Sequence, residues 1–428
     1  MIDRTKPPRL NGIGDFALPM PRRVFLDNGI PVVIIDSRDA EISRVTVMTL
    51  GGTADAPTPA VANLSAAMQN EGTHSMGSAR LATLIDFNGA SLAAAAISHH
   101  TRTQLQSLPS RISELLPVMV ETIAEPTIPE DELINVKRRR AAAAELRESV
   151  VEYQASRLAA AASFGTNHPL ANAITAQMIN NVSRDEIIEF RDRYVRPDSM
   201  CLFVTGAVSN SLIRELNQTF GKLAIPAESP TKIEIKPFEP QYSAQPKFVV
   251  EGAMQSAISM TFPTITRDNP DYLNLRLAVI ALGGYFGSRL QTEVREKQGL
   301  TYGIGARLLG YEEGGLVDIT TQCDNGSVTK VIDSVTNEIH RLISEPPTEA
   351  EMHRIVQTEF TSLLETTETP FTVTDFYITL HVAHAPIDYF ERRVAAAHCI
   401  TPRLISEMID KYLDTDRMII SIAGANTI

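Results

Sequence analysis

Histidine and cysteine are the side chains of this chain best suited to bind a metal or act as nucleophiles, and their spacing argues against both roles. Among nine histidines the only adjacent pair is His99-His100, and adjacent residues on a strand point to opposite faces of the sheet. The three cysteines (Cys201, Cys323 and Cys399) are too far apart for a disulfide framework or a zinc knuckle. We therefore predict no intrinsic metal site, and we find no Ser/His/Asp or Cys/His signature.

Two glycine-containing segments of the chain lack the motifs of nucleotide-binding sites. Gly283, Gly284 and Gly287 are not followed by the Lys-Ser/Thr pair of a phosphate loop, and Gly303-Ile-Gly305 lacks the third glycine of a dinucleotide fingerprint. The formal net charge of −12 disfavours binding to nucleic acid. We expect neither a nucleotide cofactor nor a nucleic-acid partner.

Short sequence patterns in the first half of the chain recur in the second half. Ala79-Arg80-Leu81 in the first half matches Ser288-Arg289-Leu290 in the second, and Leu202–Gly206 and Ile419–Gly424 are both apolar strands ending in glycine. Such collinear matches indicate a tandem duplication. Residues 226–246 contain five prolines, which fix φ and remove hydrogen-bond donors. We therefore predict domains at 1–225 and 247–428, joined by an extended linker at 226–246.

Local signals predict mixed secondary structure in each domain. Residues 31–35 and 42–50 read as strands, and Asp27-Asn28-Gly29 reads as a hairpin turn. Proline after Thr58 begins a helix that we expect to reach about Asn70. Helical periodicity also covers 112–123 and 131–163. Hairpins and helices without regular βαβ alternation predict an α+β fold, in which each domain is a mainly antiparallel sheet covered by helices on one face.

Five segments together resemble a known family of enzymes. They are Leu50–Gly52, Glu71–Thr73, Asn167–Leu170, Leu282–Leu290 and Val294–Gly303. In order and sequence they are similar to the zinc peptidases of the pitrilysin and mitochondrial-processing-peptidase family, the inverzincins, in which one helix has an H-x-x-E-H motif. The second-half segments resemble the carboxy-terminal domain signature of that family.

The motif that would bind zinc is degenerate in this chain. In the family, histidines at positions i and i+4 share one zinc ion, and the glutamate between them activates the bound water. Counted back from Gly72-Thr73, the corresponding positions are Asn63, Ala66 and Ala67. Alanine has no ligating atom and a neutral amide is a poor zinc ligand, so the resemblance implies that both the metal and the general base are missing.

A third family ligand, a glutamate on a later helix, would fall near Glu145. One carboxylate cannot hold a catalytic zinc ion. The simpler interpretation is that Glu145 is a solvated helix residue near Arg138 or Arg147.

The second half keeps a different part of the family machinery. An arginine and a tyrosine seven residues apart grip the substrate backbone in the family, and Arg295 and Tyr302 have that spacing. Arginine offers a rigid fork of donors to a peptide carbonyl, and a tyrosine hydroxyl can support a developing oxyanion. The alternative is structural: Arg295 would pair with Glu293 or Glu296, and Tyr302 would be a core aromatic.

The resemblance implies a non-catalytic subunit of a heterodimeric zinc endopeptidase. Arg295 and Tyr302 would bind an unfolded or short peptide in a cavity shared with an H-x-x-E-H partner, which would hold the zinc; this chain would bind no cofactor. The family also implies an edge strand that accepts peptide by β-augmentation, which the sequence does not locate. The alternative is a peptidase-derived scaffold or peptide-binding protein with no role in proteolysis, and a homodimer stays open.

The remaining expectations concern the membrane and the compartment. The longest apolar runs, such as Leu92–Ile97, are far shorter than the ~20 residues that a membrane helix needs. Residues Met1–Pro8 lack the apolar region of a secretory signal. We expect no membrane partner and a cytoplasmic location, or a periplasmic one if a leader was removed.

Overall fold

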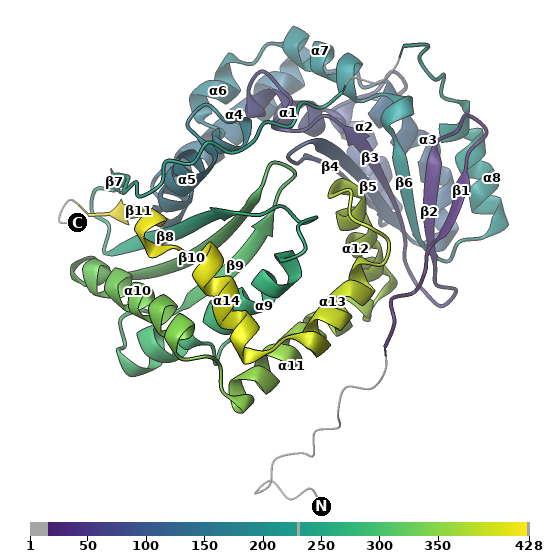
Figure 1. Ribbon diagram of the computed structural model, residues 1–428. Helices are drawn as coiled ribbons and strands as arrows, with labels where there is room; N and C mark the ends of the chain where they lie inside the picture. Colours follow the sequence, from purple (N-terminus) through teal and green to yellow (C-terminus); the bar gives the residue numbers. More distant parts are fainter. Residues whose placement is uncertain (1–15, 229–231, 426–428) are drawn as a thin grey trace, which may run out of the picture.

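The computed structural model describes residues 16–228 and 232–425 (Figure 1). The amino-terminal segment that argued against a secretory signal lies outside these ranges. Within them, no helix has the length and apolar character needed to cross a bilayer. Two β-sheets, one from each half of the chain, form the framework of the molecule.

The first sheet has six strands, arranged in the order β1-β2-β6-β3-β5-β4. Their bounds are β1 Arg22–Phe25, β2 Pro31–Asp36, β3 Ser43–Leu50, β4 Ser91–Ala96, β5 His100–Ser107 and β6 Cys201–Gly206. Strands β1 and β2 form the predicted hairpin, in which Gly29 has a φ of 89°, a conformation that glycine adopts without strain. Only the pair β2–β6 is parallel among the pairings of this sheet.

The second sheet has five strands in the order β7-β11-β8-β10-β9. Their bounds are β7 Lys247–Val249, β8 Gln255–Thr264, β9 Ile304–Gly310, β10 Gly315–Asp324 and β11 Ile419–Gly424. Again only one pair, β7–β11, is parallel. Strands β7, β11, β8, β10 and β9 thus repeat the order and directions of β2, β6, β3, β5 and β4. The predicted α+β fold, with two homologous and mainly antiparallel sheets, is confirmed.

Helices cover one face of each sheet with elements of its own half. The first half contains α1 Pro59–Met68, α2 Ser78–Phe87, α3 Pro109–Ala124, α4 Glu130–Glu148, α5 Val151–Phe164, α6 Ala176–Asn181, α7 Arg184–Tyr194 and α8 Asn210–Gln218. The second contains α9 Tyr272–Gly283, the short helix η4 Gln291–Lys297, α10 Val328–Ser344, α11 Glu349–Thr367, α12 Pro370–Val382, α13 Tyr389–Cys399 and α14 Pro402–Tyr412. Helices α2, α3 and α8 pack on the first sheet, and α9, α10 and α14 pack on the second.

The other face of each sheet is covered by a helix of the opposite half. Helix α5 lies on β8 and β11 of the second sheet, and α12 lies on β2 and β6 of the first, as Figure 1 shows. The helical periodicity predicted over residues 131–163 corresponds to two helices, α4 and α5. The helical structure breaks at Ser149 and Val150, where Val150 is extended, and the chain changes direction from α4 into α5.

A buried hydroxyl pair joins each exchanged helix to its sheet. Ser163 of α5 lies 2.7 Å from Thr261 of β8, and Thr374 of α12 lies 2.6 Å from Thr205 of β6. All four side chains are buried. Buried polar groups need partners, so these pairs favour one placement of each helix on its sheet.

The proline-rich segment has no helix or strand in its described residues. It packs along the end of α5: Phe238 stacks on Phe164 with ring centroids 4.5 Å apart, and the Glu239 amide donates to the Phe164 carbonyl at 2.9 Å. The segment therefore helps to hold α5 in its exchanged position.

The hydroxyl pair Thr205–Thr374 gives a test of how α12 is held on the sheet of the opposite half. The Thr374 hydroxyl donates to the Pro370 carbonyl at 2.8 Å, so Thr205 must donate to Thr374. Thr374→Val leaves the Thr205 donor buried without an acceptor, and we expect a loss of about 1–3 kcal/mol in the free energy of unfolding. Thr205→Val should cost less, and the double variant should cost no more than Thr374→Val alone. Urea denaturation measures all three, and additive losses would show that the hydroxyls are not coupled.

Candidate functional site

The degenerate motif lies on α1, where the sequence placed it. Ala66 is buried, and Asn63 accepts a hydrogen bond through its Oδ1 from Nη1 of Arg140 on α4, at 2.7 Å. Oδ1 of Asn63, the one atom of the three motif side chains that could ligate a metal, is therefore bound to a guanidinium group. A cation in this position is incompatible with the ligand chemistry of a zinc site.

Glu145 lies on the same helix as Arg140 but is exposed. It makes no hydrogen bond or ion pair with other described residues, including Arg138 and Arg147. Across the described parts of the chain, no group of three or more His, Cys, Asp or Glu side chains is arranged to hold a metal ion.

Strand β4 is an open edge of the first sheet beside α1. Among the described residues it pairs only with β5. Asn70, just after α1, donates to the Leu92 carbonyl at 2.8 Å. Its sequence, Ser91-Leu-Ala-Ala-Ala-Ala96, has alternately exposed and partly buried side chains and no charge. Natural edge strands usually have charges, proline or a bulge that block pairing. The absence of these features leaves β4 able to pair with an added strand.

Arg295 and Tyr302 lie next to each other in the second half. Arg295 lies on η4, and its Nε donates to the Tyr302 carbonyl at 2.7 Å. Its guanidinium carbon lies 4.6 Å from the ring centroid of Phe286 and 5.9 Å from that of Tyr302. The alternative structural roles are not observed: Glu293 pairs with Lys297 at 2.8 Å, and the Tyr302 side chain is 94% exposed.

Tyr302 lines a cavity of about 400 Å³ between α5 and the second sheet. Glu152 and Ser156 of α5 form one side, and Gln255 and Ser259 of β8 lie opposite. Most of the residues that line it have a polar side chain, although apolar atoms also contribute to the wall. The exchange of α5 creates this cavity, because the helix belongs to the first half and the sheet to the second.

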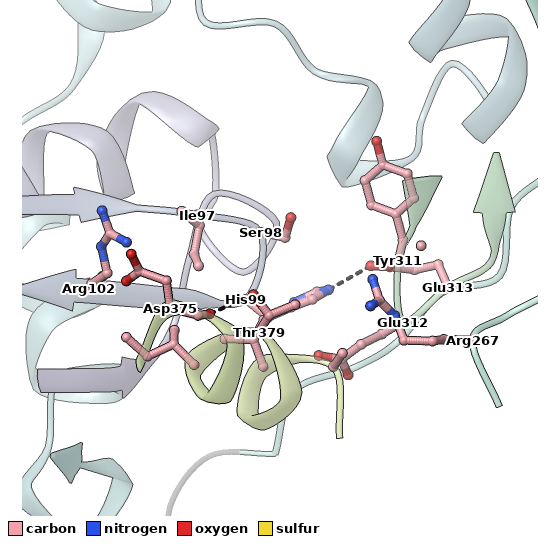
Figure 2. A pocket seen from close by; sticks show the side chains of 14 residues that line it. Ile97, Ser98, His99, Arg102, Arg267, Tyr311, Glu312, Glu313, Asp375 and Thr379 are labelled. Atoms are coloured by element: carbon pink, nitrogen blue, oxygen red, sulfur yellow. Dashed lines mark hydrogen bonds and ion pairs between the residues drawn. The ribbon is translucent and has the colours of Figure 1, made fainter. Parts of the chain in front are cut away.

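A second cavity, of about 340 Å³, lies between the two halves (Figure 2). In it, His99 points from the first half towards Glu313 of the second. Its Nε2 lies 2.6 Å from Glu313 and its Nδ1 lies 2.9 Å from Asp55, with all three side chains buried. Burial alone would lower the pKa of His99, but the hydrogen bonds and charges of Asp55 and Glu313 raise it to about 10. His99 is therefore a cation that joins the halves at neutral pH.

The neighbouring His100 has the opposite environment. Its ring packs 6.1 Å from that of His381 on α12. Burial, with smaller contributions from the charges of His381 and His99, lowers the pKa of His100 to about 4. The two adjacent histidines thus have different partners, and His99 precedes β5 instead of lying on the strand as the sequence argument assumed.

The sequence identified Arg295, Tyr302 and the degenerate motif but missed three other features. These are the contact between Arg140 and Asn63, the edge position of β4, and the contacts of His99. The run of four basic residues 137–140 was a visible signal for the first. The other two depend on sheet order and on contacts between halves, which have no local signature.

A duplicated fold whose metal-helix positions hold asparagine and two alanines defines a peptidase-like protein without the metal ligands of the peptidases. Residues 181–359 match the family model described as the peptidase M16 inactive domain, so this part of the chain is similar to the M16 peptidases, the family of the pitrilysin-type enzymes. The relationship inferred from the sequence is confirmed.

Curated relatives agree with this assignment. The chain is 22% identical over 305 residues to an uncharacterized zinc protease, YmxG, of Bacillus subtilis, covering 70% of this chain and 73% of that protein. It is 24% identical over 251 residues to a protein of Helicobacter pylori named as a non-peptidase homolog, YmxG, covering 58% and 57% respectively.

Solved structures share the fold over nearly the whole chain. A peptidase M16 inactive domain from Pseudomonas fluorescens superposes with a TM-score of 0.85 at 22% identity, covering 95% of this chain and 98% of that one. A protease from Helicobacter pylori gives a TM-score of 0.84 at 16% identity, covering 95% and 100%.

The raised pKa of His99 predicts a pH dependence of stability. Between its ordinary value of 6.5 and about 10, the folded chain holds a proton that the unfolded chain has lost. The contribution of His99 to the free energy of unfolding should therefore be fully present below pH 6.5 and be lost as the pH rises to about 10, by up to about 1.4 kcal/mol per pH unit. His99→Gln should cost on the order of 3 kcal/mol at neutral pH and remove this slope.

Chemical denaturation at a series of pH values measures both effects. The matched control is His340→Gln, because His340 is exposed and its ring bonds to the neutral hydroxyl of Thr415, at 2.8 Å. An unchanged slope in His99→Gln would contradict the assignment of the proton to His99.

Proposed function

We propose that this chain is the non-catalytic subunit of a heterodimeric zinc endopeptidase and helps to hold the peptide substrate. The partner supplies an H-x-x-E-H helix and the zinc ion, and this chain supplies Arg295 and Tyr302. The single observation that supports this most strongly is the Tyr302 side chain, 94% exposed at the rim of a cavity. A large aromatic side chain that contributes nothing to a core is suited to contact a ligand or a partner.

The geometry of Arg295 adds to this proposal. Its Nε is held by the Tyr302 carbonyl, and no carboxylate of the described residues pairs with it. The terminal nitrogens of the guanidinium group are therefore available as donors to a peptide carbonyl. The contact with Phe286 restricts the orientation of the group and reduces the entropy lost on binding.

Strand β4 supplies a second element for peptide binding. A peptide added along this edge would gain main-chain hydrogen bonds with little dependence on its side chains. The small, uncharged side chains of β4 leave room for different peptide sequences. Broad specificity for unfolded or short peptides follows from this mode of binding.

The test combines the purified chain with a homologous subunit that has an intact H-x-x-E-H motif. Alone, the chain should contain less than stoichiometric zinc and cleave no peptide. The mixture should cleave an internally quenched peptide, and Arg295→Ala or Tyr302→Phe should lower kcat/KM by about tenfold to a hundredfold. Because Tyr302 is exposed, Tyr302→Phe should leave thermal stability unchanged within about 0.5 kcal/mol.

The chain offers a matched control pair. Arg417 lies over the ring of Tyr242 at 3.8 Å, so Arg417→Ala and Tyr242→Phe change an arginine–tyrosine contact away from the cavity of Tyr302. These variants should keep the activity of the mixture. Activity that is indifferent to Arg295 and Tyr302 would contradict the proposal. Peptide binding without any gain of cleavage on mixing would favour the scaffold alternative, and sedimentation of the chain alone would reveal a homodimer.

A further inference from the structure

A basic run on α4 places one arginine against α1 with little compensating charge. Lys137 donates to the Val182 carbonyl at 2.7 Å, and Arg139 pairs with Glu71 at 3.1 Å. Arg138 is exposed. Arg140 is partly buried, and within the described residues its side chain makes one hydrogen bond, to the neutral amide of Asn63. It is the member of the run that faces the degenerate motif.

The surroundings of Arg140 are positive. Arg139 and Arg147 act on it as like charges, and Glu71, which is already bonded to Arg139, is the one carboxylate that opposes them. Burial, followed by the charges of Arg139 and Arg147, lowers the pKa of Arg140 from its ordinary value. A partly buried cation without a carboxylate partner is costly, and an anionic ligand would relieve that cost.

This cation lies near the open edge of the first sheet. Asn70 after α1 contacts Leu92 at the start of β4, and Ala96, at the end of β4, packs on the apolar cluster of α1. Asn63 precedes Asn70 by seven residues, or about 10 Å along a helix, and Ala96 lies about 13 Å beyond Leu92 along the strand. The end of β4 at Ala96 thus borders the same apolar cluster as Ala141, the neighbour of Arg140 on α4.

We propose that Arg140 binds a carboxylate of the peptide held along β4. This inference rests on the peptide binding proposed above and adds its specificity. Nη1 of Arg140 is fixed by Asn63, so the other N–H donors can form a fork to a carboxylate. The chemistry fits two sources: the C-terminal carboxylate of a peptide that runs parallel to β4, or an acidic side chain of a peptide that runs antiparallel.

The experiment measures binding of a short peptide with an uncharged N-terminal fluorophore to the full chain by anisotropy. The peptide is prepared as the free acid, as the C-terminal amide, and as amides with one internal aspartate. One of the two carboxylate forms should bind about tenfold more tightly than the plain amide, which corresponds to about 1.4 kcal/mol. The form that does so identifies the source of the carboxylate.

Variants assign the effect to Arg140. Arg140→Met should remove the preference for the carboxylate while leaving binding of the plain amide nearly unchanged. Arg140→Lys should keep part of it, because a point charge remains without the fork. The matched control is Arg138→Met, which makes the same charge change at an exposed position of the same helix and should keep the full preference.

The outcomes separate this inference from the proposed function. Equal binding of the acid, the amide and the aspartate peptides would overturn the role of Arg140 and leave peptide binding standing. A carboxylate preference that survives Arg140→Met would also overturn it. Failure of every peptide to bind would contradict the proposed function and this inference together.

Discussion

The exchange of α5 and α12 is the constraint on which the rest of the structure depends. Each sheet has one face covered by its own half and the other covered by a helix of the opposite half. Neither core is complete without the other half. If a half stood alone, one apolar face of its sheet would be exposed to water, and the stabilisation from burying that face would be lost. The relative position of the halves, and with it the cavity beside Tyr302, follows from this exchange.

Polar contacts make the exchange specific. Apolar burial alone would tolerate several placements of an alanine-rich helix such as α5 on a sheet. The buried hydroxyl pairs Ser163–Thr261 and Thr205–Thr374 lose their partners if either helix slides. Arg44 of β3 adds a bond of 2.9 Å to Asp375 on α12. Apolar burial thus joins the two halves, and a few hydrogen bonds and an ion pair fix the position of each helix on its sheet.

Local features of this chain could be predicted from its sequence, and features that depend on distant segments could not. The hairpin at Gly29 follows from its turn residues, and the start of α1 follows from the proline at its first position. The seven-residue spacing of Arg295 and Tyr302 was sufficient to pair them, although only the exposure of Tyr302 decides against a core role. The break at Val150 interrupts a segment with helical periodicity on both sides, because tertiary packing on the opposite sheet outweighs local propensity.

Two cations in this chain differ in whether nearby carboxylates neutralise them. This difference separates a charge that stabilises the fold from one that is suited to bind a ligand. His99 is enclosed by Asp55 and Glu313 from opposite halves, so its charge is satisfied within the fold and stabilises the junction. Arg140 faces a neutral amide and two like charges. Desolvation penalises both cations, but only His99 has carboxylates that repay it. Retaining an under-compensated guanidinium beside an open strand edge is costly for stability alone, and it becomes favourable when an external carboxylate completes the site.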